Sequence, residues 1–305
     1  MEIRTIWKAN LKRHAGSVCG IFLLLLLVSA SLATVLTVWS NSGRYVQQEM
    51  ERLGYGDLTA WVSGIADPEP LSAEIAALED VQSVSAQQLI FTEYEIGEQE
   101  SDSEGQLITY DPAQTPYKIF RYDLSGYEAS PIEIASGEIY VSPSMASMFG
   151  LSIGDTITFP IARSGVDKTF VVKGYFEDPF MGSSMIGMKG FLICRQDHDE
   201  ITAMIESAGN DGLARSGYML HIFQSEESSL GTAQWNAVLN QNTSLPHYVE
   251  FTHSRAAISG FMLTLQNVFT AFLLAFAAIL AAVSLVVLGH SIGSAIEQDL
   301  SLIHI

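Results

Sequence analysis

The stretch Val18–Trp39 constrains this chain more than any other, because it is apolar and no charged side chain occurs between Arg13 and Arg44. At about 1.5 Å of rise per residue, its 22 residues form a helix of roughly 33 Å, enough to cross a hydrocarbon core of about 30 Å. A core helix of a soluble protein fits less well, since no polar stripe remains to face water. We therefore predict a first transmembrane helix over residues 18–40.

A cleaved secretory signal is the main alternative for this stretch. Basic residues precede the apolar run, and Ser29-Ala30-Ser31 offers small side chains for cleavage. The run nevertheless continues well past these residues to Trp39, whose indole suits the membrane interface. An uncleaved anchor is the better interpretation.

Charge predicts the orientation of this anchor. Residues 1–14 carry four basic side chains and one acidic side chain, a net charge of +3, whereas residues 41–255 carry 11 basic and 31 acidic side chains, a net charge of −20. The positive-inside rule then places the N-terminus in the cytoplasm and residues 41–255 outside. Apolar and basic side chains recur at helical spacing before the span, which predicts a cytoplasmic amphipathic helix over residues 1–17. A merely basic flank fits these charges equally well.

A second apolar run occupies residues 256–289 and contains no formally charged side chain. Its middle, Phe269–Leu288, is long enough to be a second span, and the less apolar residues before it are expected to form a helical stalk. The chain is then expected to return to the cytoplasm near His290. These two runs predict a protein with two spans and an outer domain between them.

The outer region alternates between strand and helix patterns. Residues 57–105 and 196–252 predict an α/β part, and residues 106–195 predict a β-rich insert with a sheet or barrel of its own. In the insert, apolar residues alternate along Thr156–Ile161 and Thr169–Phe176, which predicts a hairpin. The expected fold class is therefore a membrane protein of α+β type, with two transmembrane helices flanking a large extracytoplasmic α/β domain that carries a β-rich subdomain.

Composition limits the partners of this chain. A formal charge of −19 makes nucleic acid an unsuitable partner, because no basic patch is present to neutralise phosphates. Cys19 lies in the first span and Cys194 in the outer region, so the predicted topology keeps the two thiols apart. The outer domain is therefore expected to be held together by packing, with Cys194 as a small core residue.

No motif for catalysis, a cofactor or a metal emerges from the sequence, which lacks the phosphate-loop, H-E-x-x-H, C-x-x-C and G-x-S-x-G patterns. The acidic loop Gly97–Gly105 lacks the ligand spacing of a calcium loop. Residues 181–188 hold three methionines, which we interpret as a flexible apolar loop tip rather than a soft-metal site. The Asn242-Thr243-Ser244 sequon matters only in a glycosylating pathway. The sequence predicts a protein that is not an enzyme. The outer histidines lack paired-ligand spacing: His198, His221, His247 and His253.

The arrangement resembles a known family. A basic N-terminal segment reading ANLKRHAGS precedes the first span, and the outer region contains EIYVSPSMASMFGLSIGDTITF followed by FVVKGYFEDP. The second span then leads into HSIGSAIEQD. This succession is similar to the FtsX-like and MacB-like permeases of bacterial ABC transporters over nearly the whole chain, and its most specific part, residues 138–176, looks like the periplasmic core domain of that family.

The resemblance implies a role in transmitting motion across the bacterial cytoplasmic membrane. Permeases of this family hydrolyse nothing themselves; a separate cytoplasmic ATPase subunit drives them, two permease copies assemble, and stalk helices relay motion to the outer domain. Family members export peptides or macrolides, release lipoproteins, resist antimicrobial peptides or activate cell-wall hydrolases. They also carry at least two further spans, which this sequence lacks. A lipid bilayer and an ATPase are the partners implied, and no cofactor is implied.

The cytoplasmic end, residues 290–305, is expected to begin the coupling helix that contacts the ATPase in such permeases, and a frayed, solvated tail fits this segment equally well. The resemblance assigns this contact to four residues of one segment, with an apolar face at helical spacing. The residues are Ile292, Ala295, Ile296 and Glu297. The final six residues, LSLIHI, match one reading frame of a common library adapter end and are expected not to belong to the protein.

Two other classes of function stay open. A membrane receptor has the same order of span, outer sensor domain and second span, as in sensor kinases and chemoreceptors. A membrane-tethered binding or adhesion module is the third interpretation. Sequence beyond residue 299 distinguishes the first two, since further spans favour a permease and a long heptad helix favours a receptor.

Overall fold

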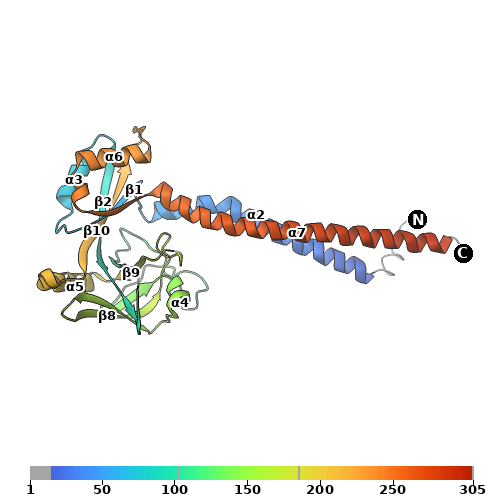
Figure 1. The fold of residues 1–305 in the computed structure, drawn as a ribbon, viewed down its shortest axis with the longest axis horizontal. Helices are drawn as coiled ribbons and strands as arrows, with labels where there is room; N and C mark the ends of the chain where they lie inside the picture. The colour runs from blue at the N-terminus through green and yellow to red at the C-terminus, as the bar shows by residue number, and fades with distance from the viewer. Residues whose placement is uncertain (1–14, 102, 185, 304–305) are drawn as a thin grey trace. The chain divides into compact units, whose positions relative to one another are not determined.

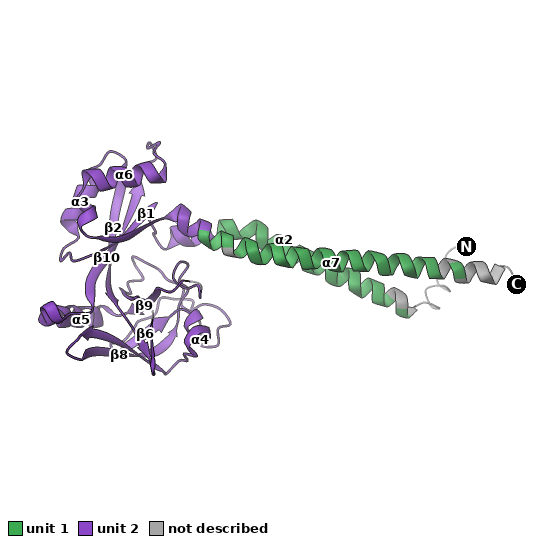
Figure 2. Cartoon of the chain, in the orientation of Figure 1, with its two compact units in different colours: residues 1–45, 261–305 green, residues 46–260 purple. Residues whose placement is uncertain are grey.

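The computed structural model describes residues 15–101, 103–184 and 186–303. These fall into two units, residues 1–45 with 261–305 and residues 46–260 (Figure 2). Most of the amphipathic segment predicted over residues 1–17 lies outside the described residues. The division agrees with a pair of apolar segments on either side of one folded domain.

Two long helices carry the apolar segments. Helix α2 (Ala15–Arg52) and helix α7 (Arg255–Ile303) lie near the two ends of the chain (Figure 1). Their most apolar stretches have mean hydropathies of 2.6 and 2.9, and both helices are long and apolar enough to cross a membrane. Their large apolar side chains are exposed, as Phe22 and Phe272 illustrate at 62% and 73%. A core helix of a soluble protein would bury these side chains, so their exposure favours lipid as their surroundings.

The folded unit begins with four antiparallel strands in the order β11-β1-β10-β2. Alternate residues of β1 face one side of this sheet, where Leu58, Ala60 and Val62 pack against helices α3 and α6. Trp61, between them in sequence, faces the opposite side and enters another apolar cluster. The element bounds are β1 (Leu58–Ser63), α3 (Glu69–Ala76), β2 (Val81–Thr92), β10 (Arg215–Gln224), α6 (Thr232–Asn242) and β11 (Val249–Ser254), with a 3-10 turn at Leu245–His247.

Strand β2 is longer than its partners and carries the sheet onward. Its last residues pair with β5, and the order continues through β9, β6, β8, β7, β3 and β4, which makes eleven strands in the described part of the chain. The pairs β5–β9 and β6–β8 are parallel. The bounds are β3 (Glu95–Ile96), β4 (Gln99–Glu100), β5 (Gly105–Thr109), β6 (Glu138–Val141), β7 (Thr156–Ala162), β8 (Val166–Tyr175) and β9 (Lys189–Ile193).

The β-rich strands enclose an aromatic core that also receives two helices. Phe159, Phe170 and Phe191 are fully buried there, with ring centroids 5.1–5.8 Å apart in edge-on geometry. Helix α4 (Ser144–Phe149) contributes Met145, and helix α5 (Arg195–Ala208), followed by a 3-10 turn at Gly209–Asp211, contributes Ile201. This core supplies much of the packing that the sequence predicted for a domain without disulfides.

Several predicted elements are confirmed. The hairpin forms as β7 and β8, although its turn is shorter than expected because the strands extend to Ala162 and start again at Val166. The prediction that the β-rich insert forms a separate sheet is wrong, because β2 pairs with β5 and joins all the strands into one sheet. Helix α5 also packs into the β-rich core, although its sequence position suggested the α/β part. The predicted boundaries of the two parts themselves stay a prediction.

Candidate functional site

The end of helix α2 is built into the folded unit. Gly54 has a φ of +69°, and the Tyr55 and Gly54 amides donate to the carbonyl oxygens of Met50 and Glu51 at 3.1 Å each. These two bonds form a Schellman turn, which requires the left-handed conformation that glycine adopts readily. Met50, Leu53 and Tyr55 are at most 1% exposed. The last turn of the helix is therefore part of the domain core.

A charged cluster fastens the same turn to the β-rich strands. The Glu49 carboxylate lies 2.8 Å from Arg52 Nη2 and 2.5 Å from Lys118 Nζ, and Arg52 also donates to the carbonyl oxygen of Pro116. Burial raises the pKa of the Glu49 carboxyl, but the hydrogen bonds from Arg52 and Lys118 outweigh it and hold this pKa below its ordinary value. The backbone carbonyl oxygen of Lys118 accepts a hydrogen bond from the Glu177 amide at 2.8 Å, just after the end of β8.

Helix α7 starts directly beside the strand that follows α2. Ser254 at the end of β11 pairs with Leu58 of β1, and its hydroxyl oxygen accepts the Ala257 amide at 3.0 Å as a helix cap. Arg255 lies 3.2 Å from the Asp57 carboxylate and donates its amide to the Asp57 carbonyl oxygen at 2.9 Å. The other Asp57 carboxylate oxygen accepts an amide of β10 at 2.9 Å. Asp57 thus connects the start of α7 with two strands of the sheet.

Together these contacts form what we call the helix–domain junction, the residues Glu49, Arg52, Asp57, Lys118 and Arg255. The Glu49–Lys118 pair links α2 to the loop residue before the Ile119–Phe176 bridge, and the Asp57–Arg255 pair links the start of α7 to the residue before β1. Because packed interiors transmit displacement instead of absorbing it, a shift of either helix end would reach the sheet directly. The five side chains of the junction show no arrangement of nucleophile and base.

No local sequence pattern marks the junction as a whole. The only local signal was a glutamate and an arginine spaced i, i+3 in the last helical turn before Gly54. Lys118, on the loop before the Ile119–Phe176 bridge, and Arg255, directly after β11, meet partners that are far away in sequence, which no local pattern reveals.

The loop at residues 181–188, where an apolar tip is expected, begins in the core and is held there by two buried charges. One Asp178 carboxylate oxygen accepts the amides of Phe180 and Met181 at 2.9 and 2.8 Å, and Lys189 donates to carbonyl oxygens at Met181, Ser183 and Ile186. Burial raises the pKa of Asp178 and lowers the pKa of Lys189. Met181 is fully buried because these charges hold the start of the loop against the core, whereas Ser184 and Gly187 are exposed. The loop-tip interpretation therefore fails at Met181 and stays a prediction for the rest of the loop. Met185 lies outside the described residues.

The histidines do not converge. His221 is 3% exposed, its Nδ1 lies 3.1 Å from Thr59 Oγ1, and burial lowers its pKa to about 4. Burial also lowers the pKa of His198 and of His253, which lie on different elements. Among the residues that the structure describes, no three His, Cys, Asp or Glu side chains form a group able to hold a metal. Cys194 and Cys19 are free thiols.

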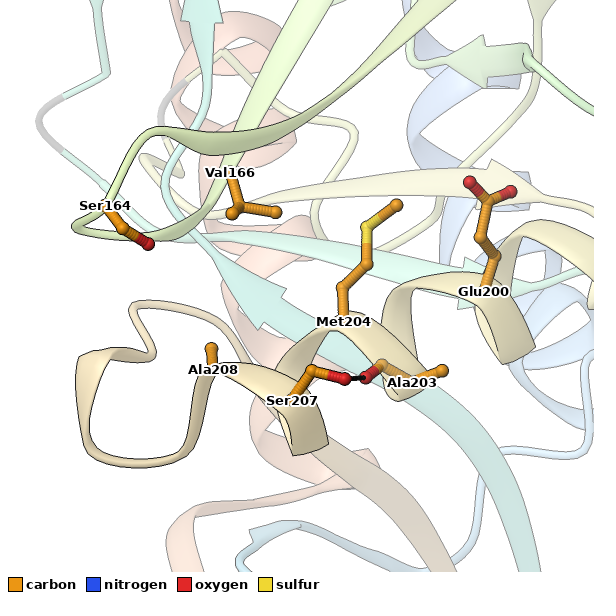
Figure 3. Close-up of a pocket in the computed structure, with 7 residues that line it drawn as sticks. All are labelled: Ser164, Val166, Glu200, Ala203, Met204, Ser207 and Ala208. Atoms are coloured by element: carbon orange, nitrogen blue, oxygen red, sulfur yellow. Dashed lines mark hydrogen bonds between the residues drawn. The ribbon is translucent and has the colours of Figure 1, made fainter.

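Three hollows lie around helix α5. A depression of about 420 Å³ has Val166 of β8 on one side and Met204 of α5 on the other (Figure 3). Its carboxylate, Glu200, is held by Lys168 at 2.7 Å. A cleft of about 750 Å³ follows the opposite side of α5, and a smaller polar cavity adjoins it. Tyr218 lines both of these and donates its hydroxyl to the Ala66 carbonyl oxygen at 3.2 Å.

The residues predicted to contact an ATPase lie in the last part of α7. Ile292 and Glu297 are exposed, whereas the side chains of Ala295 and Ile296 lie outside the described part of the structure. Of the final six residues, 300–303 continue α7 and 304–305 are outside the described range. The ATPase contact and the foreign origin of these six residues both stay predictions.

No family model and no curated protein matches this chain. Among solved structures, it is similar to the periplasmic region of MacB from Actinobacillus actinomycetemcomitans, with 11% identity and a TM-score of 0.33 over 72% of this chain and 97% of that chain. It is also similar to the extracellular domain of the noncanonic ABC-type transporter YknZ from Gram-positive bacteria, with 13% identity and a TM-score of 0.27 over 65% and 97%. Similarity at this level does not assign an activity, a substrate or a partner to this chain, so these must be inferred from its own residues.

Proposed function

We propose that this chain is a permease subunit of an ABC-type transporter, in which α2 and α7 cross the bacterial cytoplasmic membrane with the N-terminus inside. The helix–domain junction supports this proposal most directly. Two exposed apolar helices both continue into residues that ion pairs fasten to the folded domain, Glu49 to Lys118 and Arg255 to Asp57. Such an arrangement suits a protein whose outer domain is moved by events at the membrane.

In this proposal the chain itself hydrolyses nothing. A separate cytoplasmic ATPase contacts α7 around Ile292 and Ile296, and a second permease copy completes the assembly. The outer domain then moves for export, lipoprotein release or peptide resistance. The resemblance of the sequence to FtsX-like permeases supports these partners, and the exposed Ile292 supports an uncovered contact surface.

Site-directed crosslinking tests the ATPase contact. Ile296→Cys, in a chain co-expressed with the ATPase from the same gene cluster, should crosslink to that ATPase. Phe272→Cys serves as the matched control, because Phe272 lies in the middle of the apolar run of α7. Crosslinking from the control position, or none from Ile296, would contradict the proposed contact. Reporter fusions near residue 130 and at residue 290 test the topology, with outside and inside expected respectively.

A second experiment tests the relay itself. Arg255→Met removes the ion pair with Asp57 but leaves the apolar helix unchanged. We expect the purified complex to keep its ATPase activity while ATP no longer changes the fluorescence of a label in the outer domain. Arg163→Met changes an exposed arginine away from the junction and should respond as the wild type does. An unchanged response in Arg255→Met would count against the relay.

A membrane receptor with an extracytoplasmic sensor is the second candidate. The cleft and the polar cavity beside α5 favour it, because a sensor needs a place for a ligand. This alternative predicts no crosslink to an ATPase from Ile296→Cys. The two candidates are therefore separated by the same experiment.

A further inference from the structure

The parallel pair β5–β9 places two opposite charges at one edge of the sheet. Thr109 at the end of β5 is in register with Ile193 at the end of β9. Asp111 and Arg195 each lie two residues beyond the last residue of these strands. Both therefore follow the carboxyl ends of neighbouring parallel strands. Ligands of open α/β sheets commonly bind at that edge.

Both residues line the polar cavity, a hollow of about 380 Å³ between this edge, β2 and the loop before α3. This volume lies within the range of roughly 300 to 1,000 Å³ typical of small-molecule sites. Asp111 and Arg195 form no ion pair with one another. Arg195 is exposed, and among the described residues its guanidinium has neither an ion pair nor a hydrogen bond, so it is available to pair with a ligand carboxylate.

The wall of the cavity offers hydrogen-bond acceptors that have no donor. The Oε1 atoms of Gln87 and Gln88 and the Oγ1 atom of Thr109 are buried and lack a hydrogen-bond partner among the described residues. Gln87 Nε2 donates to Thr115 Oγ1 at 3.0 Å, which leaves the amide oxygen of Gln87 as its open group. Buried polar groups are normally paired. The terminal torsion of glutamine is broad, so a small rotation turns such an oxygen toward a ligand.

The charges around the cavity restrict the ligand. Asp67, Glu69 and Asp111 bring three carboxylates and Arg195 brings one guanidinium, so a purely anionic ligand such as a phosphate is disfavoured. An apolar ligand would leave the open acceptors unpaired. A ligand with an ammonium group satisfies the carboxylates and amide oxygens, and a carboxylate on the same ligand satisfies Arg195.

We propose that the polar cavity binds a small zwitterion with one ammonium and one carboxylate group, either a free amino acid or a short peptide. Its carboxylate pairs with Arg195, and its ammonium group donates to Asp111 and to an amide oxygen of Gln87 or Gln88. The site holds for a permease and for a receptor alike, so it does not depend on the function proposed above.

Calorimetric titration of the full chain in detergent, without any ATPase, tests the site. The probes are L-alanine and L-alanyl-L-alanine, which carry both charges, with N-acetyl-L-alanine and L-alaninamide as analogues that lack one charge each. We expect one or both zwitterions to bind and each analogue to bind at least about tenfold more weakly, because a charge-assisted pair is lost. Comparing alanine with its dipeptide distinguishes a free amino acid from a peptide as the ligand.

Variants then assign the contacts. Arg195→Gln and Asp111→Asn should each weaken binding of the better zwitterion by about tenfold or more, and Arg163→Gln, an exposed arginine outside the cavity, should leave it unchanged. Unaltered thermal unfolding shows that the variants are folded. The proposal is overturned if neither zwitterion binds at millimolar concentration, if the analogues bind as well as alanine, or if Arg195→Gln binds like the wild type.

Discussion

Replacing Glu49 with glutamine tests the helix–domain junction most directly. The substitution keeps the shape of the side chain but removes the charge that both Arg52 and Lys118 approach, at 2.8 and 2.5 Å. Glu49 is 9% exposed as a side chain, whereas Arg52 and Lys118 are 29% and 25% exposed and regain some hydration when the pair is broken. With that discount, two charge-assisted hydrogen bonds amount to about 1.5 kcal/mol of unfolding free energy.

Differential scanning calorimetry of the full chain in detergent measures this loss. For a domain of this size, about 1.5 kcal/mol lowers the melting temperature by roughly 3–6 °C. Glu51→Gln is the matched control on the same helical turn, because Glu51 is exposed and should change stability by less than about 0.5 kcal/mol. Since the pKa of Glu49 is held low, its contribution is complete above the ordinary carboxyl pKa of 4.5 and is lost as the pH falls through the lowered value.

The loss of unfolding free energy caused by Glu49→Gln should therefore be present at pH 7 and vanish in acid. A double-mutant cycle with Lys118→Met should show that the two changes are not additive. If Glu49→Gln melts within a degree of the wild type at pH 7, or if its effect adds fully to that of Lys118→Met, the junction does not hold the helix as argued.

Three further predictions concern the folded unit. Burial lowers the pKa of His221 from 6.5 to about 4, so the unfolded chain binds a proton before the folded chain does as the pH drops. The unfolding free energy, measured by urea titration, should therefore fall by up to about 3 kcal/mol between pH 6.5 and pH 4. His221→Gln should remove this contribution to the pH dependence. Lys189→Met deprives three carbonyl oxygens of a shared donor and should lower stability by about 2–4 kcal/mol in the same assay, with Lys173→Met, an exposed lysine, as a control that stays near zero. Gly54→Ala should lower stability by about 1 kcal/mol because of its φ of +69°, whereas Gly43→Ala inside α2 should not, and equal effects of the two would contradict the turn described at Gly54.

Local pattern was sufficient for the elements at the ends of the chain and for several within it. The uncharged lengths of residues 18–40 and 256–289 predicted two long apolar helices, and the alternation along residues 156–176 predicted a hairpin. Glycines follow the last turns of α2 and α4, and both Gly54 and Gly150 adopt a φ of +69°, a conformation that ends a helix. These features depend on residues close together in sequence, since helix and strand periodicity are properties of a short window.

The tertiary structure alone decided which strands meet. Nothing local to β2 indicates that its last residues pair with β5, yet this pairing merges the predicted β-rich sheet with the rest. The same pairing order brings Asp111 and Arg195 to one edge. The folding of the whole domain brings the loop residue Lys118 to Glu49. The tertiary structure also places Met181, at the start of the methionine loop, in the core, where Asp178 and Lys189 hold the loop. Strand edges carry interchangeable backbone donors and acceptors, so their order follows from the packing of the whole core and is not encoded in any single segment.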